Sequence, residues 1–151
     1  MKRNQKRNPG ALLSCSYLRS GDRKGSSYQA SVLQRGPADY VLMIRECASS
    51  LDPVHVRIYQ AEKNCLKQLE TIAVRSGMDS WSNLPIDRSL FHVDMPSPRM
   101  DLSFEKCFIH ISYNSVLSAE GRSALIELYQ ALLQWATPDR LLEQYDETAD
   151  M

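Results

Sequence analysis

Residues 28–47 decide the fold, and they read Tyr28-Gln29-Ala30-Ser31-Val32-Leu33-Gln34-Arg35-Gly36-Pro37-Ala38-Asp39-Tyr40-Val41-Leu42-Met43-Ile44-Arg45-Glu46-Cys47. In Tyr28–Gln34, apolar and polar residues alternate, as in a strand with one buried face. Residues 35–39 have the length and the Gly-Pro content of a hairpin loop. The run 40–44 is apolar on both faces, which favours a central strand. These residues therefore predict an antiparallel hairpin inside a sheet.

A further strand is predicted before this hairpin, at Leu12–Leu18. Residues 19–26 between the two are rich in glycine, serine and charge, which is typical of a loop. Residues 1–10 are polar and basic and end in Pro-Gly, so we expect them to form a disordered arm.

After the hairpin, Asp52-Pro53 is typical of a helix start, with an N-cap carboxylate and proline in the first helical position. Gly77 is well placed to end that helix. Apolar residues between the two recur at spacings of three and four, which predicts an amphipathic helix over residues 53–76. They are Val54, Ile58, Ala61, Cys65, Leu69 and Ile72.

The second half of the chain predicts two strands and two helices. A connection over 78–88 leads to strands at 90–95 and 102–113. In the longer strand, Phe104, Phe108 and His110 are expected on one face. A nearly all-apolar helix is expected over 119–136, and Thr137-Pro138 predicts a short last helix over 138–145.

The expected fold class is α+β, with one antiparallel sheet of about five strands and two main helices packed on one face. The predicted order is β-β-β-α-β-β-α-α, in a single domain over 11–146 with a frayed acidic tail over 147–151. This layout resembles that of small α+β secretion chaperones and other compact adaptor folds, and many unrelated domains share it.

Composition indicates a cytosolic protein without membrane spans. No apolar run approaches the roughly 20 residues that cross a bilayer. The apolar stretch 11–18 is too short and too polar for an export signal. The four cysteines lie far apart and form no CxxC pair, so we expect free thiols in a reducing compartment.

Positive charge gathers at the start of the chain. Residues 1–35 hold eight of the 18 Lys and Arg residues and one of the 18 acidic residues. Such a segment can neutralise phosphates, solubilise the chain, or meet an acidic partner or the chain's own acidic tail. No helix-turn-helix, zinc-finger or RNP motif accompanies it. The candidate anion or nucleic-acid contacts are Lys2, Arg3, Lys6, Arg7, Arg19, Arg23 and Lys24.

Few patterns point to catalysis. His92 and Asp94 share a face of a predicted strand, where the carboxylate could orient the imidazole. Cys107 and His110 are three apart on a strand and point to opposite faces. His55 is expected in the first turn of a helix, and most such residues are simply exposed. No Walker loop, GxSxG motif or metal-ligand spacing is present, so no catalytic residue, metal or cofactor is expected.

The apolar helix over 119–136 supplies the leading hypothesis, because its apolar surface exceeds what one sheet face needs. The chain's other segments could cover it as readily as a partner could. Its candidate partner-binding residues are Leu125, Leu128, Tyr129, Leu132 and Trp135. We therefore expect a small cytosolic protein-binding module that is not an enzyme and is dimeric: an adaptor, a chaperone-like protein or a regulatory factor. The alternatives are a nucleic-acid-binding accessory protein using the basic region, and an enzyme centred on His92 and Asp94.

Overall fold

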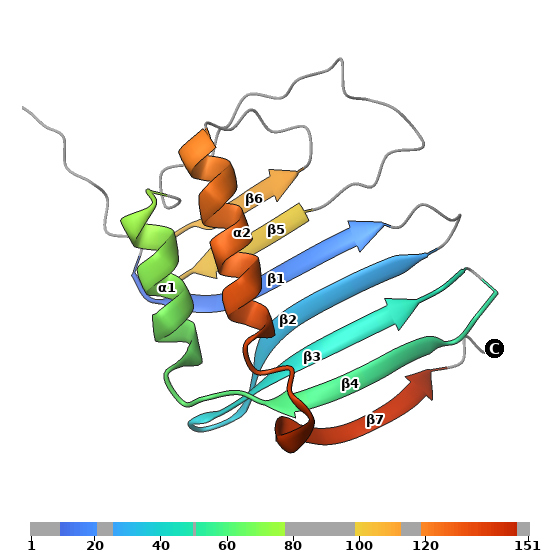
Figure 1. Cartoon of the computed structure of the whole chain (residues 1–151). Helices are drawn as coiled ribbons and strands as arrows, with labels where there is room; N and C mark the ends of the chain where they lie inside the picture. Colours follow the sequence, from blue (N-terminus) through green and yellow to red (C-terminus); the bar gives the residue numbers. More distant parts are fainter. Residues whose placement is uncertain (1–9, 21–25, 50, 78–98, 113–118, 148–151) are drawn as a thin grey trace, which may run out of the picture.

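The computed structural model describes residues 10–20, 26–49, 51–77, 99–112 and 119–147. These ranges form one seven-stranded antiparallel sheet in the order β6-β5-β1-β2-β3-β4-β7, with two α-helices on one side (Figure 1). The elements are β1 (Leu12–Ser20), β2 (Ser27–Gly36), β3 (Asp39–Cys47), β4 (Val54–Gln60), α1 (Cys65–Arg75), β5 (Arg99–Phe104), β6 (Phe108–Ser112), α2 (Ala119–Leu133), the short 3-10 helix η3 (Pro138–Arg140) and β7 (Leu141–Glu147).

The predicted hairpin is confirmed as β2 and β3. Their register places Val32 opposite Leu42 and Ala30 opposite Ile44, and all four side chains are buried in the main core. The turn consists of Pro37 and Ala38, which is shorter than the expected loop over 35–39, and Ala38 has a φ of 57°. Both strands have partners on either side, β1 beside β2 and β4 beside β3. The hairpin therefore forms the middle of the sheet, as its apolar content predicts.

The helix predicted over 53–76 is wrong in its first half. Residues 54–60 form β4, and α1 begins only at Cys65. Val54, Val56 and Ile58 alternate with His55 and Arg57, so the segment carries a period of two as well as the helical spacing. β-Branched side chains favour the extended form, and partner strands on both edges stabilise it. The expected glycine end is confirmed, since Gly77 has a φ of 78° directly after the helix.

The strand count is also higher than predicted. The single strand expected over 102–113 ends at Phe104, and the chain turns back through 105–107 into β6. The amide of Phe104 donates to the carbonyl of Cys107 at 2.8 Å and closes this turn. Phe104 consequently faces the core, whereas Phe108 and His110 are exposed.

The end of the chain differs in a similar way. The short helix expected over 138–145 is one 3-10 turn followed by β7, which pairs with the free edge of β4. The helix expected over 119–136 is confirmed as α2, ending at Leu133. The connection 78–88 and the strand 90–95 lie outside the described residues.

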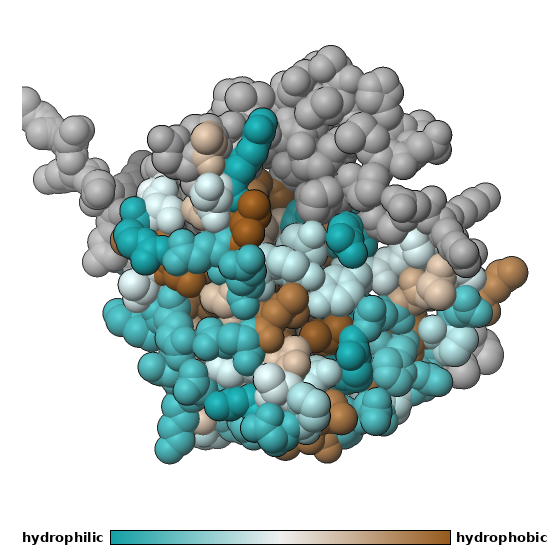
Figure 2. Space-filling model, in the orientation of Figure 1, coloured by the Kyte–Doolittle hydropathy of each residue, from teal (hydrophilic) through white to brown (hydrophobic). Residues whose placement is uncertain are grey.

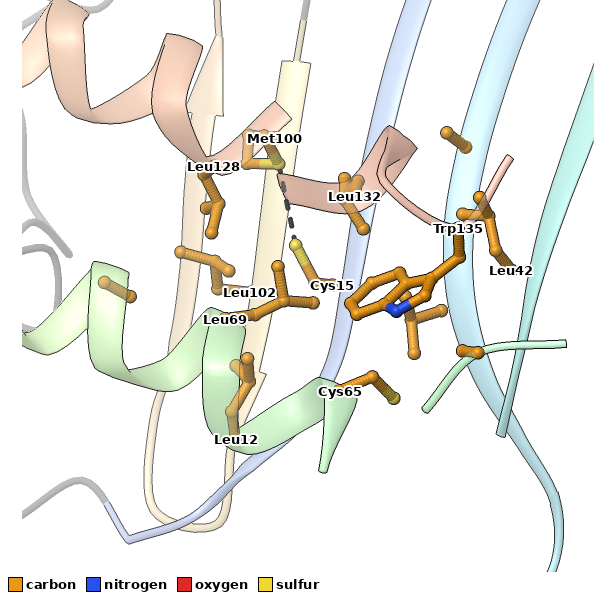
Figure 3. Close-up of a cluster of buried hydrophobic side chains, with 14 of the residues drawn as sticks. Leu12, Cys15, Leu42, Cys65, Leu69, Met100, Leu102, Leu128, Leu132 and Trp135 are labelled. Atoms are coloured by element: carbon orange, nitrogen blue, oxygen red, sulfur yellow. Dashed lines mark hydrogen bonds between the residues drawn. The ribbon is translucent and has the colours of Figure 1, made fainter. Parts of the chain in front are cut away.

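The main core lies between the sheet and the two helices (Figure 3). Cys15, Leu42 and Leu102 of the sheet meet Leu69 of α1 and Leu128 of α2, all at 0% exposure. Trp135, just beyond α2, fills the space near Leu42 and is 1% exposed. Its indole N–H donates to a carboxylate oxygen of Glu62 at 3.2 Å. That bond, with another from Gln68, lowers the pKa of Glu62.

A smaller apolar cluster lies on the other side of the sheet. Val41, Val56 and Ile58 are buried there, on the side opposite the two described α-helices. Ion pairs flank the cluster: Arg45 holds Glu147 through two contacts of 2.5 and 3.1 Å, and Arg35 lies 3.9 Å from Glu143. Because both acids belong to β7, this side of the sheet fixes the last strand against its neighbours.

No helix among the described residues is long and apolar enough to span a membrane. All four cysteines are free, as expected from their spacing. Burial raises the pKa of the Cys65 thiol to about 11, and burial also raises the pKa of Cys15.

Leu69→Ala should lower the free energy of unfolding by about 2–5 kcal/mol, because it leaves a cavity at a fully buried position. Val74→Ala on the same helix is the matched control, since Val74 is 42% exposed. We expect the free energy of unfolding of Val74→Ala to be within about 0.5 kcal/mol of that of the parent protein. Urea unfolding followed by circular dichroism measures both. Equal losses in the two variants would contradict this placement of α1.

Cys15 and Cys65 should resist alkylation by iodoacetamide at pH 8 in the native protein, because both thiols are buried and protonated at that pH. Cys47 and Cys107 are only partly buried and should react first. Mass spectrometry of peptides after timed labelling reports each site. Labelling of all four cysteines at one rate, without unfolding, would contradict the core described above.

Candidate binding surface

The helices cover only part of their side of the sheet. In Figure 1 they lie over β5, β1 and the adjoining part of β2, and the opposite ends of β2, β3, β4 and β7 extend beyond them. Among the described residues, the area that the helices leave open is mixed in polarity (Figure 2). Ionisable side chains from several strands gather there.

Strand register aligns these side chains in a row across the sheet. Directly paired residues share a face, and the pairs run from Arg19 to Tyr28, Tyr28 to Glu46, Glu46 to His55 and His55 to Asp146. Five consecutive strands thus contribute one polar residue each.

The neighbouring row brings Tyr17 and Arg57 to the same face, separated by Ala30 and Ile44. We call six residues of these two rows, together with Tyr129 of α2, the tyrosine–arginine surface. Its members are Tyr17, Tyr28, Glu46, His55, Arg57, Tyr129 and Asp146.

Three tyrosines form its aromatic part. The rings of Tyr17 and Tyr129 lie 4.2 Å apart between centroids, and Tyr28 meets them edge-on at 6.3 and 6.4 Å. A hydrogen bond joins the hydroxyls of Tyr28 and Tyr129. Edge-to-face contacts between aromatic rings contribute stabilising free energy beyond that of the apolar area they bury. The cluster therefore fixes α2 to β1 and β2 and presents partly exposed rings at the boundary of the covered region.

Arg57 forms the centre of the charged part. Its guanidinium pairs with the carboxylate of Glu46 and donates to the hydroxyl of Tyr59 at 3.4 Å. The side chain is 30% exposed, and its buried Nε has no hydrogen-bond partner among the described residues. The guanidinium is thus held in one orientation while part of its hydrogen-bonding capacity is unused.

A histidine–aspartate pair completes the row. His55 Nδ1 lies 2.7 Å from Asp146 Oδ1, and the side chains are 44% and 57% exposed. A second such pair, His110 and Asp101 at 2.5 Å, lies on the other side of the sheet. A carboxylate at Nδ1 orients an imidazole and leaves Nε2 for proton transfer. Both pairs are widely open to solvent, however, and neither is enclosed as a catalytic base would be.

Tyrosine ionisation is disfavoured on this surface. Burial, followed by the hydrogen bond to Tyr129, raises the pKa of Tyr28 well above its usual value near 10. Burial also raises the pKa of Tyr17. At neutral pH the cluster is therefore an uncharged array of rings and hydroxyls beside a charged Arg57.

The predicted partner-binding residues of α2 lie mostly inside the protein. Leu128, Leu132 and Trp135 are buried in the main core, and Leu125 and Tyr129 are partly buried against it. Packing within the chain accounts for much of this helix's apolar character. Of the five, Tyr129 belongs to the tyrosine–arginine surface. A partner-binding role for all five stays a prediction.

Most of the other predicted contacts fall outside the described residues. This holds for His92 and Asp94 and for the basic residues Lys2, Arg3, Lys6, Arg7, Arg23 and Lys24. Arg19 is described, and it is exposed near the end of β1, beside Tyr28 in the cross-strand row. A nucleic-acid role for the basic region therefore stays a prediction.

Metal binding finds no support among the described residues, where no group of three or more His, Cys, Asp or Glu side chains could hold an ion. A hollow of about 840 Å³ lies between the start of α1 and the ends of β1 and β2, and Leu66, Tyr40 and Lys63 are among the residues that line it. It is open and holds no paired catalytic groups, so it adds no chemistry to the surface above.

The chain matches no protein-family profile, and no curated protein matches it significantly in sequence.

Tyr28→Phe should make the protein less sensitive to alkali. A raised pKa in the folded state gives stability that is present below the ordinary value near 10 and is lost as pH rises above it. The parent protein should therefore lose stability between pH 9 and pH 11 more steeply than the variant. Urea unfolding at both pH values measures the difference. Parallel losses in the two proteins would contradict the Tyr28 environment described here.

Proposed function

We propose that this protein is a non-enzymatic protein-binding module, an adaptor, chaperone-like or regulatory factor of the cytosol, and that the tyrosine–arginine surface contacts its partner. The observation that carries the proposal is the junction of three contacting tyrosines with an oriented arginine on an uncovered sheet face. Tyrosine and arginine are enriched among the residues that dominate protein–protein binding energy.

Preorganisation supports this assignment. The tyrosine rings contact one another, and Arg57 is held by Glu46 and Tyr59, so these side chains have little rotamer freedom left to lose on binding. Tyrosine also combines an apolar ring with a hydroxyl that hydrogen-bonds at a wet interface. Rigid side chains of this kind reduce the entropic cost of association.

Charge layout favours a protein partner over a highly charged polymer. The tyrosine–arginine surface carries both signs, with Glu46 paired to Arg57 and Asp146 beside the imidazole of His55. A nucleic acid needs a surplus of positive charge to release its counterions. A surface of mixed sign instead suits a partner with interspersed charges of its own, because such charges set orientation and exclude wrong partners.

The openness of both histidine–aspartate pairs argues for binding and against catalysis. A general base works best in a site that excludes water and positions substrate. His55 and His110 are 44% and 48% exposed, and neither lies among the residues lining the hollow beside α1. The orientation of His55 by Asp146 is equally useful at an interface, because it fixes the direction in which the imidazole donates or accepts a hydrogen bond.

Site-specific photo-crosslinking tests the proposal. A benzophenone amino acid replaces Tyr28 in one protein and Ile126 in a control, since Ile126 is 57% exposed on the outer side of α2. In extract of the producing cells, position 28 should crosslink to a defined protein and position 126 should not. Arg57→Gln, checked for folding by circular dichroism, should weaken that interaction at least about tenfold, as loss of a dominant interface residue does. Equal crosslinking from both positions, or full binding by Arg57→Gln, would refute the assignment.

A further inference from the structure

β7 forms one edge of the sheet, and its outer side has no partner strand among the described residues. All of its inner side pairs with β4, from Val54 opposite Glu147 to Tyr59 opposite Leu141. Exposed edge strands usually carry lysine or proline, which prevent another strand from adding to them. β7 contains neither, since its sequence is Leu-Leu-Glu-Gln-Tyr-Asp-Glu. Two other protective features are present, three acidic side chains and a β-bulge at the start of the strand, and the bulge leaves residues 143–147 regular.

The acids of β7 are already matched by the chain's own strands. Glu147 is held by Arg45 of β3, Asp146 by His55 of β4, and Glu143 lies 3.9 Å from Arg35 of β2. Arginines of the chain thus partly neutralise Glu143 and Glu147, which lowers the repulsion that an approaching strand would meet. Two apolar side chains are left open on the strand, Leu142 at 46% and Tyr145 at 40% exposure.

We propose that β7 pairs antiparallel with β7 of a second copy of this chain, about a two-fold axis at Gln144. Closed two-fold dimers are the commonest assemblies of soluble proteins, and strand addition is a common way to make them. The inference concerns the outer backbone edge of β7, whereas the tyrosine–arginine surface lies on the sheet face and takes only Asp146 from this strand. Either assignment can therefore fail without the other.

Charge selects the register. With Gln144 on the axis, Glu143 lies opposite Tyr145, and Leu142 lies opposite Asp146 of the other copy, so no like charges face each other. With Tyr145 on the axis, Glu143 would face Glu147. With Glu143 on the axis, the Glu143 side chains of the two copies would face each other. Gln144 also lies within the regular part of the strand, residues 143–147.

The dimer joins the two sheets into one. A two-fold axis perpendicular to a sheet keeps each face on its own side, so the helices and the tyrosine–arginine surfaces of both copies lie on the same side. A partner with two binding elements would then gain from simultaneous contact with both copies.

A disulfide trap tests the register. In a Cys47→Ser, Cys107→Ser background, Gln144→Cys should give a covalent dimer on mild oxidation, because paired residues on an antiparallel axis have Cα atoms about 4.5–5.5 Å apart. Tyr145→Cys is the matched control and should stay monomeric, since position 145 lies opposite position 143. Equal crosslinking by both, or by neither, would overturn the proposed register.

A charge substitution tests the interface in solution. Gln144→Lys places two ammonium groups opposite each other on the axis and should raise the dissociation constant of the dimer about tenfold. Gln130→Lys makes the same change on the exposed side of α2 and should leave the dissociation constant of the dimer unchanged. Sedimentation equilibrium over a range of concentrations measures both. A protein that is monomeric throughout, or a dimer unaffected by Gln144→Lys, overturns the inference, whereas photo-crosslinking from position 28 still tests the proposed function separately.

Discussion

The position of β4 between β3 and β7 is the constraint on which the rest of the structure depends. β4 pairs with β3 along one edge and with β7 along the other, and this arrangement aligns Glu46, His55 and Asp146 across three strands. It also buries Val56 and Ile58 on the side opposite the two described α-helices, where ion pairs to β7 surround them. If residues 54–60 were helical, β7 would have no partner and the polar row would not exist.

The two helices cover part of the seven-stranded sheet and leave part of the same face open among the described residues. Beyond the helices, the side chains on this face change from Leu42 and Leu102, which are buried, to Glu46, His55 and Arg57, which are partly exposed. The tyrosines lie at the boundary, with their rings against α2 and part of their surface open. A single face thus serves as core at one end and as the proposed binding surface at the other.

The sequence predicted local features well where one signal dominated. The β2–β3 hairpin, α2 and the glycine end of α1 agree with the structure, as do the α+β class and the free cysteines. Segment 54–60 was misassigned because Val54, Ile58 and Ala61 fit a helical spacing, whereas the alternation of Val56 and Ile58 with Arg57 fits a strand. Only the neighbouring strands, which are distant in sequence, decide between the two.

The candidate surface was beyond sequence reasoning for the same reason. His55 and Asp146 are 91 positions apart, and His110 and Asp101 are nine apart across a turn. Neither spacing suggests a pair until the register is known. The register also has a consequence for synthesis. β7 follows the other described strands in the chain, so the outer edge of β4 stays unpaired until residues 141–147 have left the ribosome. A nascent chain in which β4 has formed without β7 exposes that edge and the apolar residues beside it, and its escape from aggregation depends on how soon residues 141–147 arrive.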